Sequence, residues 1–186
     1  MTTVIRRLEE QDIGGVLACL RTYGFHLLDG RVADSDFPED AVLSVRNAIS
    51  DFDLRERCWL AEREGSILGF CSWDWLDQPQ RLAKTLLIVV LPAARSLGVG
   101  SMLQRRRMAE MKEAGAREVH TWSDDPGAIQ WYKDRFGYVE VGRAPLLHCL
   151  HRFRWGERSE WGIHRGFRDR DELAHLVADL TTWKGE

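Results

Sequence analysis

The sequence predicts a domain of the α/β (α+β) class, in which strands and helices share one core. An apolar run rich in β-branched residues covers 86–91 and ends at Pro92, as a buried strand does, because proline has no N–H to donate. A turn with two glycines follows and leads into a helical pattern of apolar residues over 98–111. Two further apolar runs, at 57–62 and 67–73, flank a glycine turn and are typical of a β-hairpin.

The composition suits one domain. The chain has 186 residues, of which 44% are hydrophobic, and this is enough for one sizeable core. The formal net charge of -3 gives no general attraction to nucleic acid or to an anionic membrane. The first residues lack the apolar centre of a secretory signal, and no apolar run is long enough to span a bilayer. We therefore expect a cytoplasmic protein without a nucleic-acid or membrane partner.

The cysteines and histidines predict neither a disulfide framework nor a metal site. Four cysteines lie far apart in the sequence: Cys19, Cys58, Cys71 and Cys149. Most of them stand within apolar segments, so we expect reduced and mostly buried thiols. His148 and His151 flank Cys149, but in a strand these two side chains point to opposite faces, and no metal is expected there.

The chain opens with a predicted strand over residues 3–8. Acidic residues then precede apolar residues at helical spacing from Ile13 onward, which predicts a helix with acids in its first turn. Residues 23–36 are mixed in character and predict a loop or a broken helix, and a second helix is expected over 39–48.

After the hairpin, residues 73–79 are expected to form a loop in front of the 86–91 strand. This loop carries two tryptophans and two acids: Trp73, Asp74, Trp75 and Asp77. In one interpretation the tryptophans cap the edge of the sheet and the carboxylates are solvated. In the other they line an acceptor pocket, where the indoles pack against a substrate and the acids attract its ammonium group.

The second half continues the alternation of strands and helices. A strand is predicted over 118–122, after Gly115, which suits the end of a helix, and a helix is predicted over 128–135. Residues 138–141 and 146–153 are expected to close the sheet as a β-hairpin.

Residues 156–186 are expected to form an appendage on a main domain of residues 1–155. An extra strand is predicted over 161–167 and an amphipathic helix over 169–183. The helix prediction rests on apolar residues at positions i, i+3, i+4 and i+7: Leu173, Leu176, Val177 and Leu180. The two roles expected for such an appendage are to cover the core or to form a homodimer contact.

The glycines after the 86–91 strand outline an anion site with the pattern Arg95-x-x-Gly98-x-Gly100. Glycine lets the backbone approach a ligand closely, and the free N–H groups of a first helical turn suit a pyrophosphate. The same spacing also opens helices for packing reasons alone, so the pattern by itself leaves both interpretations open.

Two blocks of sequence together resemble the GNAT superfamily of acyl-CoA-dependent N-acyltransferases. The first block joins Val90-Leu91-Pro92 to Arg95-x-x-Gly98-x-Gly100. The second block covers residues 122–138 and includes Asp125, Ala128, Tyr132 and Gly137. The order and separation of the blocks are similar to those of the family. The resemblance implies the GNAT fold, a central mixed, mostly antiparallel sheet of about seven strands flanked by helices.

The resemblance also implies acetyl-CoA as the cofactor. The backbone of residues 88–90 would pair with the pantetheine arm in a gap between the fourth and fifth strands, and the turn before the helix would hold the pyrophosphate. The residues implied in cofactor binding are Ile88, Val89, Val90, Arg95, Ser96, Leu97, Gly98, Val99, Gly100, Ser101 and Asp125. Asp125 stands where the family usually has asparagine, and an ionised carboxylate can only accept hydrogen bonds.

Tyr132 and His120 are the catalytic candidates. Tyr132 matches the family tyrosine near the thioester sulfur, where a phenol can protonate a leaving thiolate; otherwise it is a packing residue. His120 stands five positions before Asp125, where it matches a glutamate that some family members carry on the fifth strand. A histidine, with an ordinary pKa of about 6.5, can accept a proton from an ammonium group. Otherwise His120 only lines the sheet, and the proton leaves through ordered water. The alternative bases acting through water are Glu62, Asp74 and Asp77.

The function predicted is that of an acetyl-CoA-dependent N-acetyltransferase. It would move the acetyl group directly to a primary amine of a small molecule or peptide, through a tetrahedral intermediate. Two alternatives stay open: a GNAT-fold enzyme that uses a longer acyl-CoA, and a non-catalytic acyl-CoA-binding regulatory module.

Overall fold

The structure is a computed structural model that describes residues 2–16, 18–19, 56–123, 125–144 and 173–185. Its elements, in chain order, are β1 (Val4–Arg7), η1 (Glu10–Asp12), β2 (Cys58–Arg63), β3 (Ser66–Asp77), β4 (Leu82–Val90), η3 (Pro92–Ala94), α4 (Val99–Glu113), β5 (Glu118–Ser123), α5 (Pro126–Phe136), β6 (Val139–Ala144) and β7 (Leu173–Asp179). Residues 13–16 and 18–19 are helical and follow η1. The elements predicted over 23–36, 39–48, 146–153 and 161–167 lie outside the described residues.

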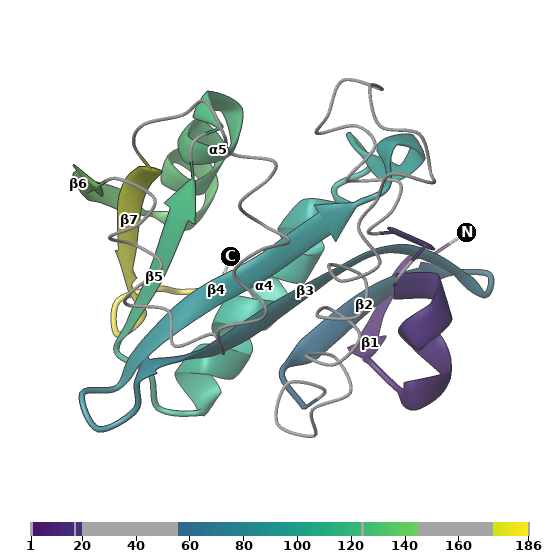
Figure 1. Cartoon of the computed structure of the whole chain (residues 1–186), viewed down its shortest axis with the longest axis horizontal. Coiled ribbons are helices and arrows are strands. Elements are labelled where there is room, and N and C mark those ends of the chain that lie inside the picture. The colour runs from purple at the N-terminus through teal and green to yellow at the C-terminus, as the bar shows by residue number, and fades with distance from the viewer. Residues whose placement is uncertain (1, 17, 20–55, 124, 145–172, 186) are drawn as a thin grey trace.

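The seven strands form one sheet in the order β1-β2-β3-β4-β5-β7-β6 (Figure 1). All neighbours pair antiparallel except β4 and β5, which are parallel. The prediction of a mixed, mostly antiparallel sheet of about seven strands flanked by helices is therefore confirmed. The helix predicted over 128–135 is α5, and the strand and helix predicted around Pro92 are β4 and α4.

Helices lie on both faces of the sheet. Leu103 of α4 packs on one face with Ala61 of β2. Val16 of the N-terminal helical segment packs on the opposite face with Leu60. Adjacent residues of β2 thus serve different cores, because side chains alternate along a strand. In Figure 1 the N-terminal helical segment accordingly lies in front of the strands and α4 lies behind them.

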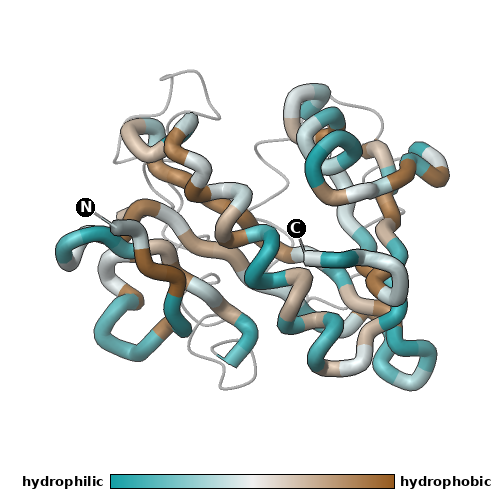
Figure 2. The backbone as a smooth tube through the Cα atoms, turned by 180° about the vertical axis from the view of Figure 1, so that it is seen from behind, coloured by the Kyte–Doolittle hydropathy of each residue, from teal (hydrophilic) through white to brown (hydrophobic). Residues whose placement is uncertain are grey.

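The buried side of α4 is partly polar. Figure 2, which views the molecule from behind, shows hydrophilic stretches along this helix. Gln104 and Arg107 are among its polar residues, yet both are 0% exposed. Both lie in the same helical turns as the buried apolar residues Leu103 and Met111, so the helix buries charge as well as hydrocarbon.

The helix predicted over 169–183 is wrong for the described residues, because residues Leu173–Asp179 form strand β7. This strand lies between β5 and β6 and pairs antiparallel with both. Leu176 and Ala178 are buried in the core, and the partly exposed Val177 falls between them, as the period of two requires. A strand paired on both sides tolerates a nearly continuous apolar run, and such a run also fits a helical pattern.

The loop predicted over 73–79 is also wrong over most of its length. β3 continues to Asp77 and β4 begins at Leu82, so the turn is limited to residues 78–81. Asp74 pairs with Lys84 across the two strands. Trp73 is only 2% exposed, so it belongs to the core and does not cap an edge. The alternation of tryptophan and aspartate in residues 73–75 is in fact typical of a strand, because one face of this hairpin is apolar and the other is polar.

Three of the cysteines, Cys19, Cys58 and Cys71, are buried free thiols, as predicted, and Cys149 lies outside the described residues. In the described part of the chain, no group of three or more histidine, cysteine or acidic side chains could hold a metal ion. No helix among the described residues is long and apolar enough to cross a membrane.

Candidate active site

The parallel strands β4 and β5 separate after a short shared ladder. They pair only over Leu82–Lys84 and Glu118–His120, although β4 continues to Val90 and β5 to Ser123. The two strands diverge visibly beyond this point in Figure 1. The predicted separation of the fourth and fifth strands is therefore confirmed. Past Lys84, the backbone N–H and C=O groups of β4 that face β5 have no ladder partner on that strand, so they can pair with an extended ligand.

A β-bulge distorts β4 just beyond the point of separation. In the β3–β4 ladder, Cys71 faces Ile88 and Trp73 faces Thr85, so Ser72 alone stands opposite two residues of β4. Those two are Leu86 and Leu87. A bulge leaves an extra residue unpaired and turns the strand locally, and such distortions are common beside functional sites.

The turn between β4 and α4 has the geometry of an anion site. Gly98 is the N-cap of α4 with φ of 78°, and no side chain caps the first turn. The φ of Ser96 is also positive, at 65°. The first turn of α4 contains no acidic residue. The first N–H groups of a helix have no intrahelical acceptor, so this turn can bind a negatively charged group.

Gly100 lies against the end of β4 and against α5. A Cβ atom placed there would lie 3.6 Å from Val90 Cγ2 and 3.7 Å from Trp131 Cζ2. A methyl group would therefore fit in ordinary contact, whereas a longer side chain would have to avoid both Val90 and Trp131. This geometry fits the pyrophosphate-binding role predicted for the turn. Arg95 is close by and donates from Nε to the Val90 carbonyl oxygen at 3.4 Å.

Tyr132 lies on the face of the sheet that α4 and α5 cover, and Arg107 links it to the bulge. Its side chain is 5% exposed, and its hydroxyl oxygen accepts a hydrogen bond from Arg107 Nη2 at 3.4 Å. Arg107 in turn donates from Nη1 to the Leu87 carbonyl oxygen of β4 at 2.9 Å. The phenol is thus connected through one side chain to the distorted part of β4.

Asp125 caps α5 with its side chain. Its Oδ1 accepts hydrogen bonds from the backbone N–H groups of Gly127 at 2.7 Å and Ala128 at 3.3 Å. Aspartate is among the preferred N-cap residues, and Pro126 suits the first helical position. This carboxylate therefore has a structural role in α5. Its contact with a cofactor stays a prediction.

His120 lies on the other face of the sheet from Tyr132. Its neighbours Val119 and Thr121 point to the face that α4 and α5 cover: Val119 packs in the same cluster as Tyr132, and Thr121 Oγ1 lies 2.5 Å from Thr85 Oγ1 of β4. This confirms that His120 faces away from both neighbours, as predicted. His120 stands at the last pair of the β4–β5 ladder, where the strands begin to separate.

A second histidine, His175 of β7, lies beside His120. The Nδ1 atom of His120 is 2.9 Å from Nε2 of His175. The ring of Trp122 stacks on His175 with 4.6 Å between centroids. Sequence reasoning missed His175, because the partner of His120 depends on β7 pairing beside β5.

Two of the alternative bases have structural partners. Glu62 lies 2.6 Å from Arg6 in an ion pair, and strands β3 and β4 separate it from β5. Asp77 caps the β3–β4 turn, because its Oδ1 accepts from the Gln80 N–H at 3.0 Å. Neither carboxylate lies at the separation of β4 and β5.

Asp74 is the alternative base closest to His120 in the sheet. Its carboxylate pairs with Arg57 and lies 4.0 Å from Lys84 Nζ. Lys84 stands opposite His120 in the β4–β5 ladder. Burial lowers the pKa of Lys84, and the charge of Asp74 opposes that shift. Lys84 and His120 therefore form a polar region on this face, with Asp74 at its edge.

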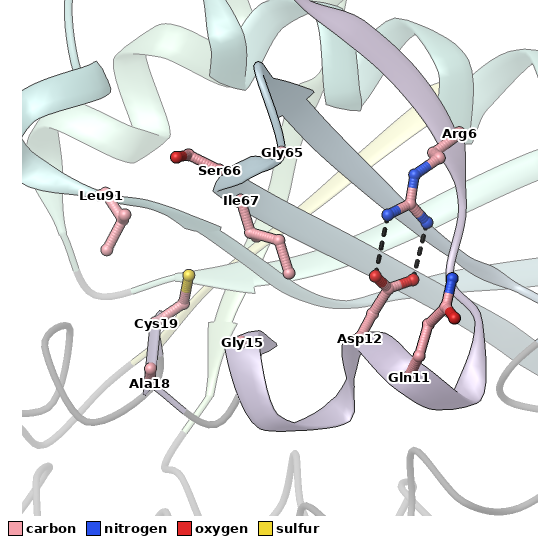
Figure 3. A pocket seen from close by; sticks show the side chains of 10 residues that line it. All are labelled: Arg6, Gln11, Asp12, Gly15, Ala18, Cys19, Gly65, Ser66, Ile67 and Leu91. Carbon is pink, nitrogen blue, oxygen red and sulfur yellow. Dashed lines mark hydrogen bonds and ion pairs between the residues drawn. The ribbon is translucent and has the colours of Figure 1, made fainter.

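A separate hollow of about 480 Å³ lies beside the N-terminal helical segment and is not the active-site candidate (Figure 3). Arg6 and Asp12 face each other in it, with a bidentate pair at 2.6 and 2.8 Å. The hydrogen bonds from Arg6 lower the pKa of Asp12. These charges satisfy each other, and neither Tyr132 nor His120 lines this hollow.

The family model described as "Acetyltransferase (GNAT) family" matches residues 24–138. The chain belongs to the GNAT acetyltransferase family. Both sequence blocks and the separating strands β4 and β5 fall within this match. Members of this family use acetyl-CoA, so acetyl-CoA is the cofactor of this acetyltransferase. The open backbone of β4 and the glycine turn before α4 fit such a ligand.

Among curated proteins, the GNAT chain is similar to mycothiol acetyltransferase of Sanguibacter keddieii. The two are 31% identical over 132 residues, which cover 66% of this chain and 39% of that protein. The match thus spans well under half the length of that relative.

Solved structures share the fold at low sequence identity. The TM-score is 0.66 with an N-acetyltransferase from Staphylococcus aureus Mu50, at 19% identity over 97% of this chain and 99% of that chain. It is 0.63 with Ard1 from Thermoplasma volcanium, at 18% identity over 96% and 98%. It is 0.64 with yncA from Salmonella typhimurium, solved with its cofactor acetyl-CoA, at 16% identity over 97% and 95%.

Proposed function

We propose that this GNAT acetyltransferase is an N-acetyltransferase that moves the acetyl group of acetyl-CoA directly to a primary amine. The observation that carries the proposal is the position of the two catalytic candidates. Tyr132 is linked to β4 through Arg107 on the face covered by α4 and α5, and His120 stands on the opposite face where β4 and β5 separate. A donor and an amine can therefore meet between a proton donor and a proton acceptor.

The glycine turn and β4 would hold the donor. N–H groups at the start of α4 would bind the pyrophosphate, and the backbone of β4 beyond Lys84 would pair with the pantetheine arm. When bound, acetyl-CoA supplies the acetyl group as a thioester. The β4 backbone around Ile88 follows the bulge and would place an N–H beside the developing oxyanion.

The two side chains would move the protons. Neutral His120 would accept a proton from the acceptor ammonium group, directly or through a water, and its bond to His175 would fix the orientation of its ring. Tyr132 holds a hydroxyl proton that it would give to the departing thiolate. The two roles need opposite protonation states, which is why two different residue types on opposite faces suit this chemistry.

The described cysteines support direct transfer without an acyl-enzyme. Cys19, Cys58 and Cys71 are 3%, 2% and 0% exposed, and burial raises the pKa of each thiol. A thiol must ionise and reach the donor to act as a nucleophile. None of these three groups satisfies the conditions, so the amine itself is the proposed nucleophile.

Purified protein should be assayed with acetyl-CoA against a broad panel of primary amines, together with Tyr132→Phe. We expect thiol release with an amine, and a loss of turnover of about 100-fold or more in the variant, in the range general acids contribute. The increase in melting temperature caused by CoA should be retained, because only the hydroxyl is removed.

The outcome of this assay separates the alternatives. Turnover only with longer acyl-CoA thioesters would replace acetyl-CoA as the donor. CoA-induced stabilisation without turnover on any amine would favour a binding module. Unchanged turnover in Tyr132→Phe would remove the phenol from catalysis.

A further inference from the structure

Arg107 of α4 is a buried cation without an acidic partner among the described residues. Its side chain is 0% exposed. The hydrogen bonds that it donates in the described part of the chain all go to uncharged groups. Its Nε is buried without a hydrogen-bond partner there. A buried charge of this kind costs more than an apolar side chain of the same volume, so packing alone does not explain its presence.

One end of the guanidinium holds the β4 bulge. Nη1 donates to the Ser72 carbonyl oxygen of β3 at 3.0 Å and to the Leu87 carbonyl oxygen of β4 at 2.9 Å. Ser72 is the residue that faces two residues of β4, and Leu87 is one of those two. Arg107 thus joins the two strands where their own register is broken, close to where β4 leaves β5.

The other end of the guanidinium points at two side chains. Nη2 donates to the Tyr132 hydroxyl oxygen at 3.4 Å and also to Gln104 Oε1. With its carbonyl oxygen facing Arg107, Gln104 presents its amide N–H to the Tyr138 hydroxyl oxygen, at 3.1 Å. Arg107 sets these directions, because a guanidinium can only donate. Gln104 must therefore turn its carbonyl oxygen toward Arg107 and its NH₂ group toward Tyr138.

This direction has a consequence for Tyr132. An oxygen that accepts from a guanidinium cannot direct its own proton at that guanidinium. The Tyr132 proton therefore points away from Arg107 and stays available to another acceptor. Because Arg107 bonds both to this hydroxyl and to the Leu87 carbonyl oxygen, it ties the proton donor to the part of β4 that has left β5.

We propose that Arg107 is a positioning residue that fixes the Tyr132 hydroxyl as a proton donor and anchors the β4 bulge beside it. The proposal rests on the proposed function, in which Tyr132 is the general acid. One guanidinium thereby fixes the position of the proton donor relative to the bulge of β4, which faces the proposed cofactor site.

A double-mutant cycle tests the kinetic part. Arg107→Met replaces the buried cation with a shorter, flexible, apolar side chain and removes every donor. We expect kcat to fall about tenfold or more, a share of what a general acid contributes, with the KM for acetyl-CoA changed by less than about threefold. In a Tyr132→Phe background the same change should cost clearly less than in the wild-type background, because only the anchoring of the β4 bulge is then still lost. A full, multiplicative loss in that background would overturn the proposal.

Arg106→Met is the matched control on the same helix. Arg106 lies over the Trp59 ring at 4.0 Å and does not bond to Tyr132 among the described contacts. Its substitution should leave kcat within about twofold, as expected for a partly exposed cation. Comparable losses of kcat in both variants would also overturn the proposal, because they would show a general effect of α4.

A measurement without substrate tests the contact itself. The chain has three tyrosines, so ¹³Cζ-tyrosine NMR gives three signals, and Tyr132→Phe assigns one of them. The Tyr132 signal should shift in Arg107→Met and not in Arg106→Met. An unchanged Tyr132 signal in a folded Arg107→Met protein would overturn the positioning role. If instead Tyr132→Phe alone keeps full turnover, the general-acid assignment of the proposed function fails, while the NMR result still decides the contact.

Discussion

The Nδ1 atom of His120 lies 2.9 Å from the Nε2 atom of His175, although 55 positions separate them in the chain. One of these nitrogens must donate and the other accept, so the hydrogen bond requires at least one of the two facing nitrogens to be unprotonated. Two charged imidazoles at this distance would repel each other. The protonation states of the two rings are therefore coupled through this bond.

This pair predicts a pH dependence of the reaction. A base must be neutral before it accepts a proton, so kcat/KM should rise with pH through an ionisation of the free enzyme. Replacing His120 by glutamine keeps a hydrogen-bonding side chain but removes the titration. The acidic limb and most of the rate should then disappear in a pH–rate profile.

The control for this profile is His175→Gln. It leaves His120 in place but removes the coupled ring, so the limb should move along the pH axis and not vanish. If His120→Gln keeps both its rate and its limb, the proton leaves by another route, and Asp74 beside Lys84 is the next residue to test.

A second prediction concerns the glycine turn and the first residues of α4. Gly100→Glu should abolish the CoA-induced rise in melting temperature, because it places bulk and negative charge where the pyrophosphate is expected. Gly100→Gln separates the two causes, since it adds similar bulk without charge. Gly100→Ala should bind CoA nearly normally, because its methyl group would lie 3.6 Å from Val90 Cγ2. Thermal-shift titrations with CoA would measure all three, and unchanged affinity in Gly100→Glu would remove the turn from cofactor binding.

A third prediction concerns the stability of the sheet on α4. Glu110 Oε2 accepts from the indole N–H groups of Trp59 and Trp73, both at 2.6 Å. Glu110→Ala would leave two buried donors without an acceptor, so we expect the free energy of unfolding to fall by about 2–5 kcal/mol. Urea unfolding followed by tryptophan fluorescence would measure it.

The matched control for this stability measurement is Glu113→Ala, one helical turn later. The Glu113 side chain is 64% exposed and lies 3.6 Å from Arg106. An exposed pair of this kind contributes little, so the expected change is within about 0.5 kcal/mol. Equal losses in the two variants would mean that the indole bonds to Glu110 do not matter for stability.

A fourth prediction concerns thiol reactivity. Burial is the main cause that raises the pKa of Cys58 to about 12 and that of Cys71 to about 11. Only the thiolate reacts, and at pH 8 it is about one part in a thousand or less of either group. Both should resist iodoacetamide in the native protein and react fully in urea, as peptide mass spectrometry would show. Rapid native labelling of either cysteine would contradict the buried position in β2 and β3.

Local sequence determined much of the fold and part of the candidate site. Pro92 ends β4 because it lacks an N–H, and Gly98 takes the positive φ that begins α4. Both features depend on a few adjacent residues, so they can be predicted without the rest of the chain. The same holds for Tyr132 on α5 and for the opposite orientations of His120 and its neighbours on β5, which follow from the period of two.

The tertiary structure alone decided the rest. The apolar residues from Leu173 to Leu180 fit a helical spacing, and only pairing with β5 and β6 makes residues Leu173–Asp179 a strand and brings His175 to His120. Arg107 stands four residues from both Leu103 and Met111, which was a signal that it shares their buried side. Its role nevertheless depends on where β3 and β4 place a bulge. The strand pairing of β7 and the role of Arg107 were both decided by contacts between distant parts of the sequence. The free energy of a strand pair or of a buried charge depends on such partners.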